Sequence, residues 1–135
     1  MACEITAVDR VLLVRWTSSI TDEDWTYLLD QVRQQAEGQE QVIFCVDCRA
    51  LTRRLDETRE NQLRQMFESD NPKLLRSAIL VEANEFMLQL NEVIRNSRNP
   101  NRRVLYTDEA LLEWLTPVLS PKEKKAVHAM ISRRR

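Results

Sequence analysis

Apolar residues in this chain follow two spacings, one typical of strands and the other of helices. Short apolar runs predict strands at 4–19, 41–48, 77–83 and 102–108. The first run holds two strands joined by a tight turn at Asp9 and Arg10. The segments between the runs carry apolar residues three and four positions apart, which indicates amphipathic helices. The sequence therefore predicts the order ββαβαβαβα, followed by an additional C-terminal helix.

This order predicts an α/β fold. Strands that alternate with helices are joined by crossover connections, so a sheet of about five strands should be mostly parallel. The N-terminal hairpin adds one antiparallel strand, which makes the sheet mixed. Pro117 interrupts the fourth helix. We therefore expect residues 1–116 to form the domain and residues 117–135 to form a helical extension packed on it or projecting from it.

Residues that favour helix starts precede each helical segment. The expected N-caps are Thr21, Asp56, Asn84, Asp108 and Ser120. Glu123 follows Ser120 at the spacing of a capping box. The second helix is expected from roughly Asp56 to Ser69, and Gly38 marks the expected end of the first.

Composition and charge exclude several classes of protein. The 135 residues suffice for one domain, and 20 Lys and Arg nearly balance 21 Asp and Glu, so no overall field favours nucleic acid or an anionic membrane. The basic C-terminal residues are typical of a helix end and have no interleaved aromatic residues; they are Lys122, Lys124, Lys125 and Arg133–Arg135. No apolar run is long enough to span a membrane, and the N-terminus lacks a signal-peptide pattern. The odd number of cysteines, three, favours a reducing cytoplasm.

The motif most suggestive of chemistry is the C-x-x-C of Cys45 and Cys48. Side chains alternate along a strand, so these two thiols are expected on opposite faces, where they form neither a disulfide nor a shared metal site. Only Cys3, His128 and carboxylates remain as further zinc ligands. A single glycine in the chain excludes a glycine-rich phosphate loop. We expect no metal, no cofactor and no catalytic residues.

The segment from Asp47 to Thr58 remains as the candidate site. Asp47 ends a central strand, where α/β folds place functional groups, and the second helix follows. A phosphate on Thr58 would meet the free amides of the first helical turn. The alternative is that Asp56 caps the helix, Glu57 complements the helix dipole and Thr58 is an exposed residue without a role.

Several stretches resemble the STAS domain, and more closely the bacterial STAS-like proteins related to anti-sigma-factor antagonists and the SEC14-like fold. They are the opening hairpin and the segments ITDEDWTYLLDQV, VIFCVDCRAL, SAILVEANEFMLQLNEVIR and RRVLYTDEALLEWL, which together extend from Glu4 to about Leu115. The resemblance implies binding to a protein partner without catalysis. It also implies a phosphoacceptor at the start of the second helix, which corresponds to Thr58. Asp56 and Thr58 match the family's acceptor motif in type, whereas Glu57 and Arg59 do not.

We therefore expect a cytoplasmic regulatory or scaffold protein that binds a protein partner. The expected binding residues are Asp47, Arg49, Arg53, Arg54, Asp56 and Thr58, in which the arginines form a basic rim. A second hypothesis is a carrier that holds a lipid or nucleotide between the second and third helices. Its pocket would be lined by Met66, Phe67, Phe86 and Met87. A third hypothesis is a structural subunit of a homo-oligomer.

Overall fold

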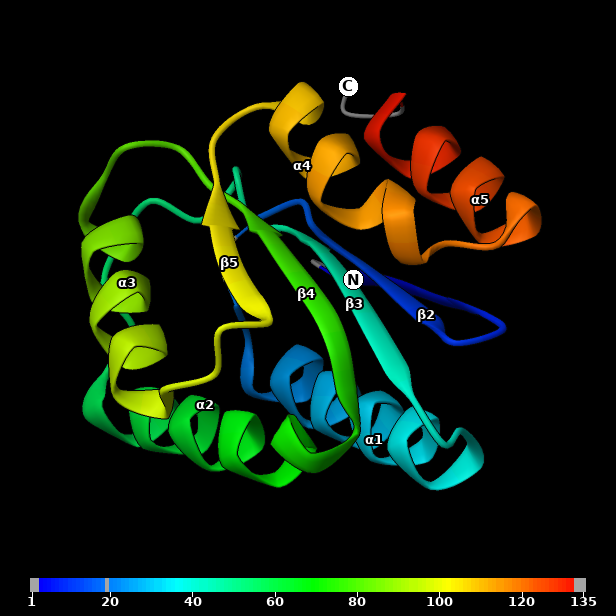
Figure 1. Cartoon of the computed structure of the whole chain (residues 1–135). Helices are drawn as coiled ribbons and strands as arrows, with labels where there is room; N and C mark the ends of the chain where they lie inside the picture. The colour runs from blue at the N-terminus through cyan, green and yellow to red at the C-terminus, as the bar shows by residue number, and fades with distance from the viewer. Residues whose placement is uncertain (1–2, 19, 133–135) are drawn as a thin grey trace.

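The computed structural model describes residues 3–18 and 20–132, apart from the side chains of 69–71. The described chain contains five strands and five α-helices; helices and strands alternate from the initial hairpin to α4, and α5 follows α4 (Figure 1). Short 3-10 helices follow the second and fourth α-helices, at Asn71–Lys73 and Thr116–Val118. The elements are β1 (Cys3–Val8), β2 (Val11–Trp16), α1 (Asp22–Gly38), β3 (Val42–Asp47), α2 (Glu57–Asp70), β4 (Leu74–Leu80), α3 (Glu85–Ser97), β5 (Arg102–Leu105), α4 (Asp108–Leu115) and α5 (Pro121–Ser132).

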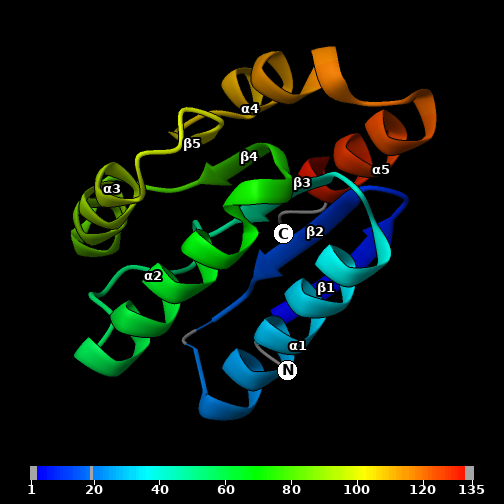
Figure 2. The same cartoon turned by 60° about the horizontal axis from the view of Figure 1, so that its bottom comes forward.

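The strands form a single mixed sheet in the order β1-β2-β3-β4-β5. β1 pairs with β2 in antiparallel orientation and the remaining pairs are parallel, which confirms the predicted α/β fold. Each crossover from β2 onward advances by one strand in the same direction. Right-handed crossovers therefore place α1, α2 and α3 on one face of the sheet. The chain then returns across the other face, where α4 and α5 lie (Figures 1 and 2).

Two hydrophobic cores lie on opposite faces of the same strands. Phe44 and Val14 face α1–α3, whereas their neighbours Ile43 and Leu13 face α4 and α5. The alternation of strand side chains produces this division. It also separates the two thiols of the C-x-x-C motif, as the sequence predicts. Cys45 belongs to the core beneath α4 and α5, and Cys48 to the core beneath α1–α3.

Most of the predicted helix starts are correct. The side chains of Thr21 and Asn84 accept hydrogen bonds from backbone amides of α1 and α3. The prediction for Asp108 is wrong, because Thr107 is the N-cap of α4 and accepts a 3.1 Å bond from the amide of Ala110. Thr107 has the extended backbone of an N-cap, so α4 begins at Asp108, one residue earlier than expected.

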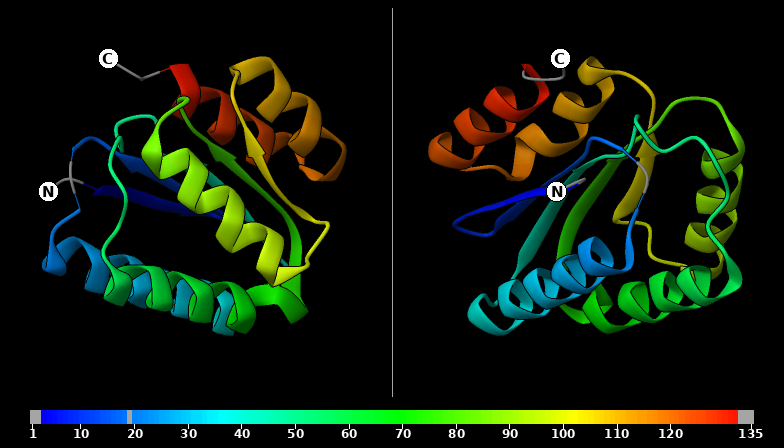
Figure 3. Two further views of the ribbon diagram at one scale, coloured as in Figure 1. Left: turned by 90° about the vertical axis from the view of Figure 1, so that its left-hand side faces the viewer. Right: turned by 180° about the vertical axis from the view of Figure 1, so that it is seen from behind.

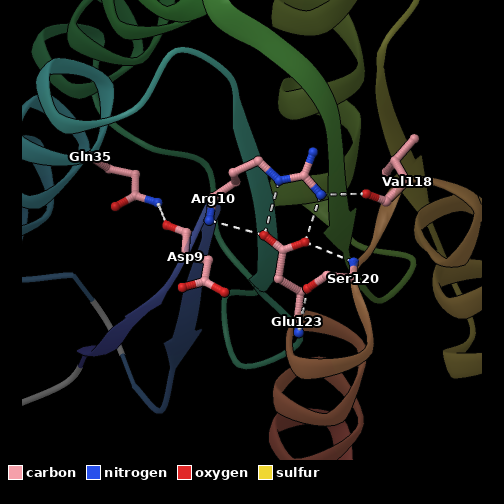
Figure 4. Close-up of polar contacts among 6 residues, drawn as sticks. All are labelled: Asp9, Arg10, Gln35, Val118, Ser120 and Glu123. Carbon is pink, nitrogen blue, oxygen red and sulfur yellow. Dashed lines mark hydrogen bonds and ion pairs between the residues drawn. The ribbon is translucent and has the colours of Figure 1, made fainter.

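A buried carboxylate holds α5 against the β1–β2 turn (Figure 4). Glu123 is fully buried and accepts bonds of 3.0, 3.2 and 2.7 Å from the backbone N, Nε and Nη2 of Arg10. The amide of Ser120 donates a further 2.8 Å bond, which confirms the predicted capping box. The guanidinium of Arg10 also donates to the carbonyl of Val118. We call this cluster of Arg10, Ser120 and Glu123 the hairpin clamp.

The opposite side of the turn is held by α1. The amide of Gln35 donates a 2.9 Å bond to the carbonyl of Asp9, which has a left-handed φ of 51°. The first hairpin is thereby fixed to a helix on each face of the sheet. Arg133–Arg135 of the basic C-terminal segment lie outside the described residues. No helix within the described ranges is long and apolar enough to cross a membrane.

Candidate functional site

Two of the predicted binding residues form an internal ion-pair cluster. Asp47 ends the central strand β3, as expected, but it is 4% exposed and accepts bonds of 2.8 to 3.0 Å from the guanidinium and backbone amide of Arg49. Arg49 also pairs with Asp108 at the start of α4, at 3.2 Å. The hydrogen bonds to Asp47 raise the pKa of Arg49 above its usual range. These residues join the end of β3 to α4 and present little surface to a partner.

The loop that follows Arg49 is held in place by α3. Gln89 is 2% exposed, and its side-chain amide accepts from the backbone N of Leu55 and donates to the carbonyl of the same residue, at 2.6 and 3.0 Å. Asn84 donates to the carbonyl of Leu51, whose side chain is buried. Figure 3 shows this loop passing beside α3 to reach the start of α2. The loop is therefore a fixed part of the fold.

The outer side of the same loop carries the remaining predicted residues. Arg53, Arg54, Asp56 and Thr58 are all exposed. The first three line a groove with a volume of about 300 Å³, and Thr58 lies in the first turn of α2 beside it. We call this feature the arginine groove. Its complete lining is Ile20, Ala50, Leu51, Thr52, Arg53, Arg54, Leu55, Asp56 and Arg59.

Two residues at the start of α2, Asp56 and Arg59, line the arginine groove and are held by contacts within the fold. Asp56 accepts a 2.8 Å bond from the amide of Arg59, so its predicted role as a cap is confirmed. The side chain of Arg59 pairs with Asp22 and lies 5.8 Å from the ring of Trp25, which ties α2 to α1. Glu60 accepts from Gln89 and Arg64, and these bonds lower its pKa below the usual range.

The arginines of the arginine groove differ in how far they are neutralised. Arg53 has no ion pair within the described residues, and Arg54 approaches Glu60 only at 3.7 Å, with 54% of its side chain exposed. Ion pairs this exposed contribute little to stability and are easily exchanged for an external partner. The guanidinium of Arg59, by contrast, already forms an ion pair with Asp22. The arginine groove therefore offers two available guanidinium groups beside an exposed threonine.

A second feature, a small apolar cavity, lies between the sheet and α1–α3. It measures about 60 Å³, and Met66, Phe67 and Phe86 are in its wall, whereas Met87 is not. The buried Nε1 of Trp25 and Oγ of Ser77 belong to residues of the same wall and have no hydrogen-bond partner within the described residues. The cavity has less than half the volume of an engineered cavity of about 150 Å³ that accommodates benzene. A lipid or a nucleotide does not fit this space.

Three contributors to this region were not predicted from the sequence. Ile20 and Arg59 line the arginine groove, and Gln89 holds the loop. Gln89 carries a sequence signal, because it falls on the apolar stripe of α3 between Phe86 and Val93. A polar residue in such a position usually has a buried hydrogen-bond partner. The contribution of Ile20 comes from the distant β2–α1 connection and has no comparable signal.

Metal binding finds no support in the described part of the chain, which contains no group of three His, Cys, Asp or Glu side chains placed to hold an ion. Comparisons with family models, curated proteins and solved structures find no match to this chain.

Proposed function

We propose that this chain is a non-catalytic regulatory or scaffold domain that binds a protein partner through the arginine groove. The observation that carries the proposal is the pair of exposed arginines, Arg53 and Arg54, on a loop whose backbone is held by α3. Arginine is well suited to interfaces, and a preformed loop loses little conformational entropy on binding. The partner segment is acidic, since it replaces the weak contact of Arg54 with Glu60.

The proposed domain is STAS-like and bacterial. Its support is the observed ββαβαβαβα order and the position of the arginine groove after the central strand. The resemblance adds a switch at Thr58. A phosphoryl group there would bring about −1.5 to −2 charges to the rim of the arginine groove and repel an acidic partner. Three cysteines without a disulfide support a reducing cytoplasm as the location.

The experiment is affinity capture with charge-reversed variants. The double variant Arg53→Glu/Arg54→Glu should lose the partner, with at least about a tenfold fall in captured protein, because two favourable charge contacts become repulsive. The matched control is Lys124→Glu/Lys125→Glu, which changes the charge equally on the exposed side of α5. Equal capture by both double variants would contradict the proposal.

Thr58→Asp and Thr58→Ala test the switch separately. Loss of the partner with aspartate and retention with alanine support phosphorylation control. Equal binding by both variants limits the proposal to a constitutive interface.

The apolar cavity favours a second candidate function, a carrier of a small molecule. Its unpartnered Ser77 hydroxyl and Trp25 indole N–H would suit only a ligand smaller than benzene that carries a hydrogen-bonding group. Native mass spectrometry of the purified protein distinguishes the two functions. A retained mass that is lost in Ser77→Ala supports the carrier, and the apoprotein mass alone argues against it.

A further inference from the structure

The arginine groove contains apolar surface as well as charge. Ile20 lines it from the β2–α1 connection, and Leu55 lines it from the loop before α2. Both side chains are partly exposed, and both also pack against the core beneath α1–α3, which fixes their positions. An apolar centre inside a charged rim is the usual arrangement of a protein interface.

Positive charge predominates in the lining of the arginine groove. Three arginines line it, against the single carboxylate of Asp56. That carboxylate already accepts a hydrogen bond from the amide of Arg59 at the start of α2. Arg53 has no ion pair within the described residues, and Arg54 has only its 3.7 Å contact with Glu60. The surplus of guanidinium groups favours carboxylates as the charged groups of a bound segment.

The backbone of the same loop also has groups available for binding. α3 holds the carbonyl of Leu51 and both the amide and the carbonyl of Leu55. The amides of the three residues 52–54 between them have no hydrogen-bond partner in the part of the chain that the structure describes. Backbone N–H groups are strong donors, so these amides can bind carboxylates or backbone carbonyls of a partner.

The volume of the arginine groove sets the size of the apolar group that it can hold. At about 300 Å³ the groove has about twice the volume of an engineered cavity of about 150 Å³ that accommodates benzene. One phenyl or branched aliphatic side chain therefore fits beside Ile20 and Leu55. The remaining space admits the flanking carboxylates near Arg53 and Arg54.

We propose that the arginine groove binds an acidic segment with a single apolar anchor. The anchor packs on Ile20 and Leu55, and the carboxylates that flank it bind Arg53 and Arg54. This inference rests on the proposed function and adds the chemical class of the partner segment. The buried anchor supplies most of the affinity, whereas the charges select acidic segments over basic ones.

The test measures fluorescence anisotropy of three labelled peptides with the 135-residue chain. The first peptide is Glu-Asp-Phe-Asp-Glu, the second has Ser in place of Phe, and the third has Lys in place of every acidic residue. The first should bind at least about tenfold more tightly than the second, because only the first buries an apolar side chain. It should exceed the third by a similar factor, because the arginines repel lysine. This comparison needs no variant to fold.

Ile20→Ser tests the position of the anchor. It should weaken binding of the Phe peptide about tenfold and leave binding of the Ser peptide unchanged, because only the Phe peptide contacts this residue. The matched control is Ile94→Ser. Ile94 is also partly exposed and packs against the same core, but it lies on α3 outside the arginine groove. This control should bind both acidic peptides as wild type does.

The outcomes separate this inference from the proposed function. Equal binding of the two acidic peptides overturns the anchor, as does binding of the basic peptide as tight as that of the Phe peptide. Absence of binding by the Phe peptide at about 1 mM also overturns it. None of these results contradicts the proposed function, which fails instead if Arg53→Glu/Arg54→Glu retains the captured partner.

Discussion

Glu123 is the most deeply buried charged residue of the described chain, with 0% of its surface exposed. Burial alone would raise its pKa, but hydrogen bonds from the Arg10 side chain and from the backbone of Ser120 and Arg10 lower it from 4.5 to about 2. A carboxyl with a depressed folded-state pKa contributes stability above its unfolded pKa. This contribution is lost as the pH falls from about 4.5 towards 2 and amounts to about 3 kcal/mol.

Glu123→Gln should lower the free energy of unfolding by about 1–3 kcal/mol at neutral pH, because the buried charge-assisted bonds to Arg10 are lost. Urea denaturation from pH 7 to pH 2 measures this difference, which should shrink as the wild-type carboxylate becomes protonated. Glu113→Gln is the matched control, since Glu113 is exposed, and it should stay within about 0.5 kcal/mol of wild type. A Glu123→Gln deficit that is constant across this range would contradict the assignment.

The sequence predicts the contacts of Glu123 with residues a few positions away, but not its contacts with residues far away in the chain. The capping box of Ser120 and Glu123 follows from their spacing, whereas Arg10 is 113 residues away from Glu123. The same limit applies to Arg49. An arginine in this position suggests an interface, but Arg49 donates to Asp47, two residues away, and to Asp108, 59 residues away, and the second partner has no local signal in the sequence.

At the scale of elements, α3 positions the arginine groove through one side chain. Gln89→Leu keeps the size of the residue but leaves the amide and carbonyl of Leu55 without their bonds. We expect a loss of about 1–3 kcal/mol in unfolding free energy. We also expect faster amide hydrogen exchange in residues 50–56, because this loop loses its attachment to α3.

The control for this prediction is Gln34→Leu, which makes the same change at an exposed position of α1. Its exchange pattern should match wild type. Unchanged exchange in residues 50–56 of Gln89→Leu would show that the loop is held by other contacts, such as the bond from Asn84 to Leu51.

Elements themselves are well predicted because their signals are local. The alternation of strands and helices, the hairpin turn and the caps at Thr21, Asn84 and Asp56 all depend on residues within a few positions of each other. The second helix was expected from Asp56 to Ser69 and spans Glu57–Asp70. The arginine groove is predicted less completely, because Ile20 enters it from another connection.

At the scale of the whole molecule, both cores depend on the same strands. The side chains of β2, β3 and β4 alternate between them, so each helix layer packs against one side of the same three strands. The three thiols are divided between the two cores. Cys45 lies in one core, and Cys3 and Cys48 lie in the other; all are buried, and burial raises their pKa values.

Thiol labelling should therefore report cooperative unfolding. We expect no reaction of Cys45 or Cys48 with Ellman's reagent in native protein at pH 8, and reaction of all three thiols in denaturant. Variants that retain only Cys45 or only Cys48 should label at equal rates at intermediate urea concentrations. Faster labelling of Cys45 alone would show that α4 and α5 detach before the rest.

The hairpin clamp has a consequence for biosynthesis. Arg10 leaves the ribosome 113 residues before Glu123, an interval on the order of 10 s at ordinary translation rates. During that time the strands can assemble with α1–α3, but the apolar face formed by Val11, Leu13 and Ile43 has no cover. A nascent chain in this state is a natural client for chaperones, and stalled translation before α5 would yield an aggregation-prone fragment.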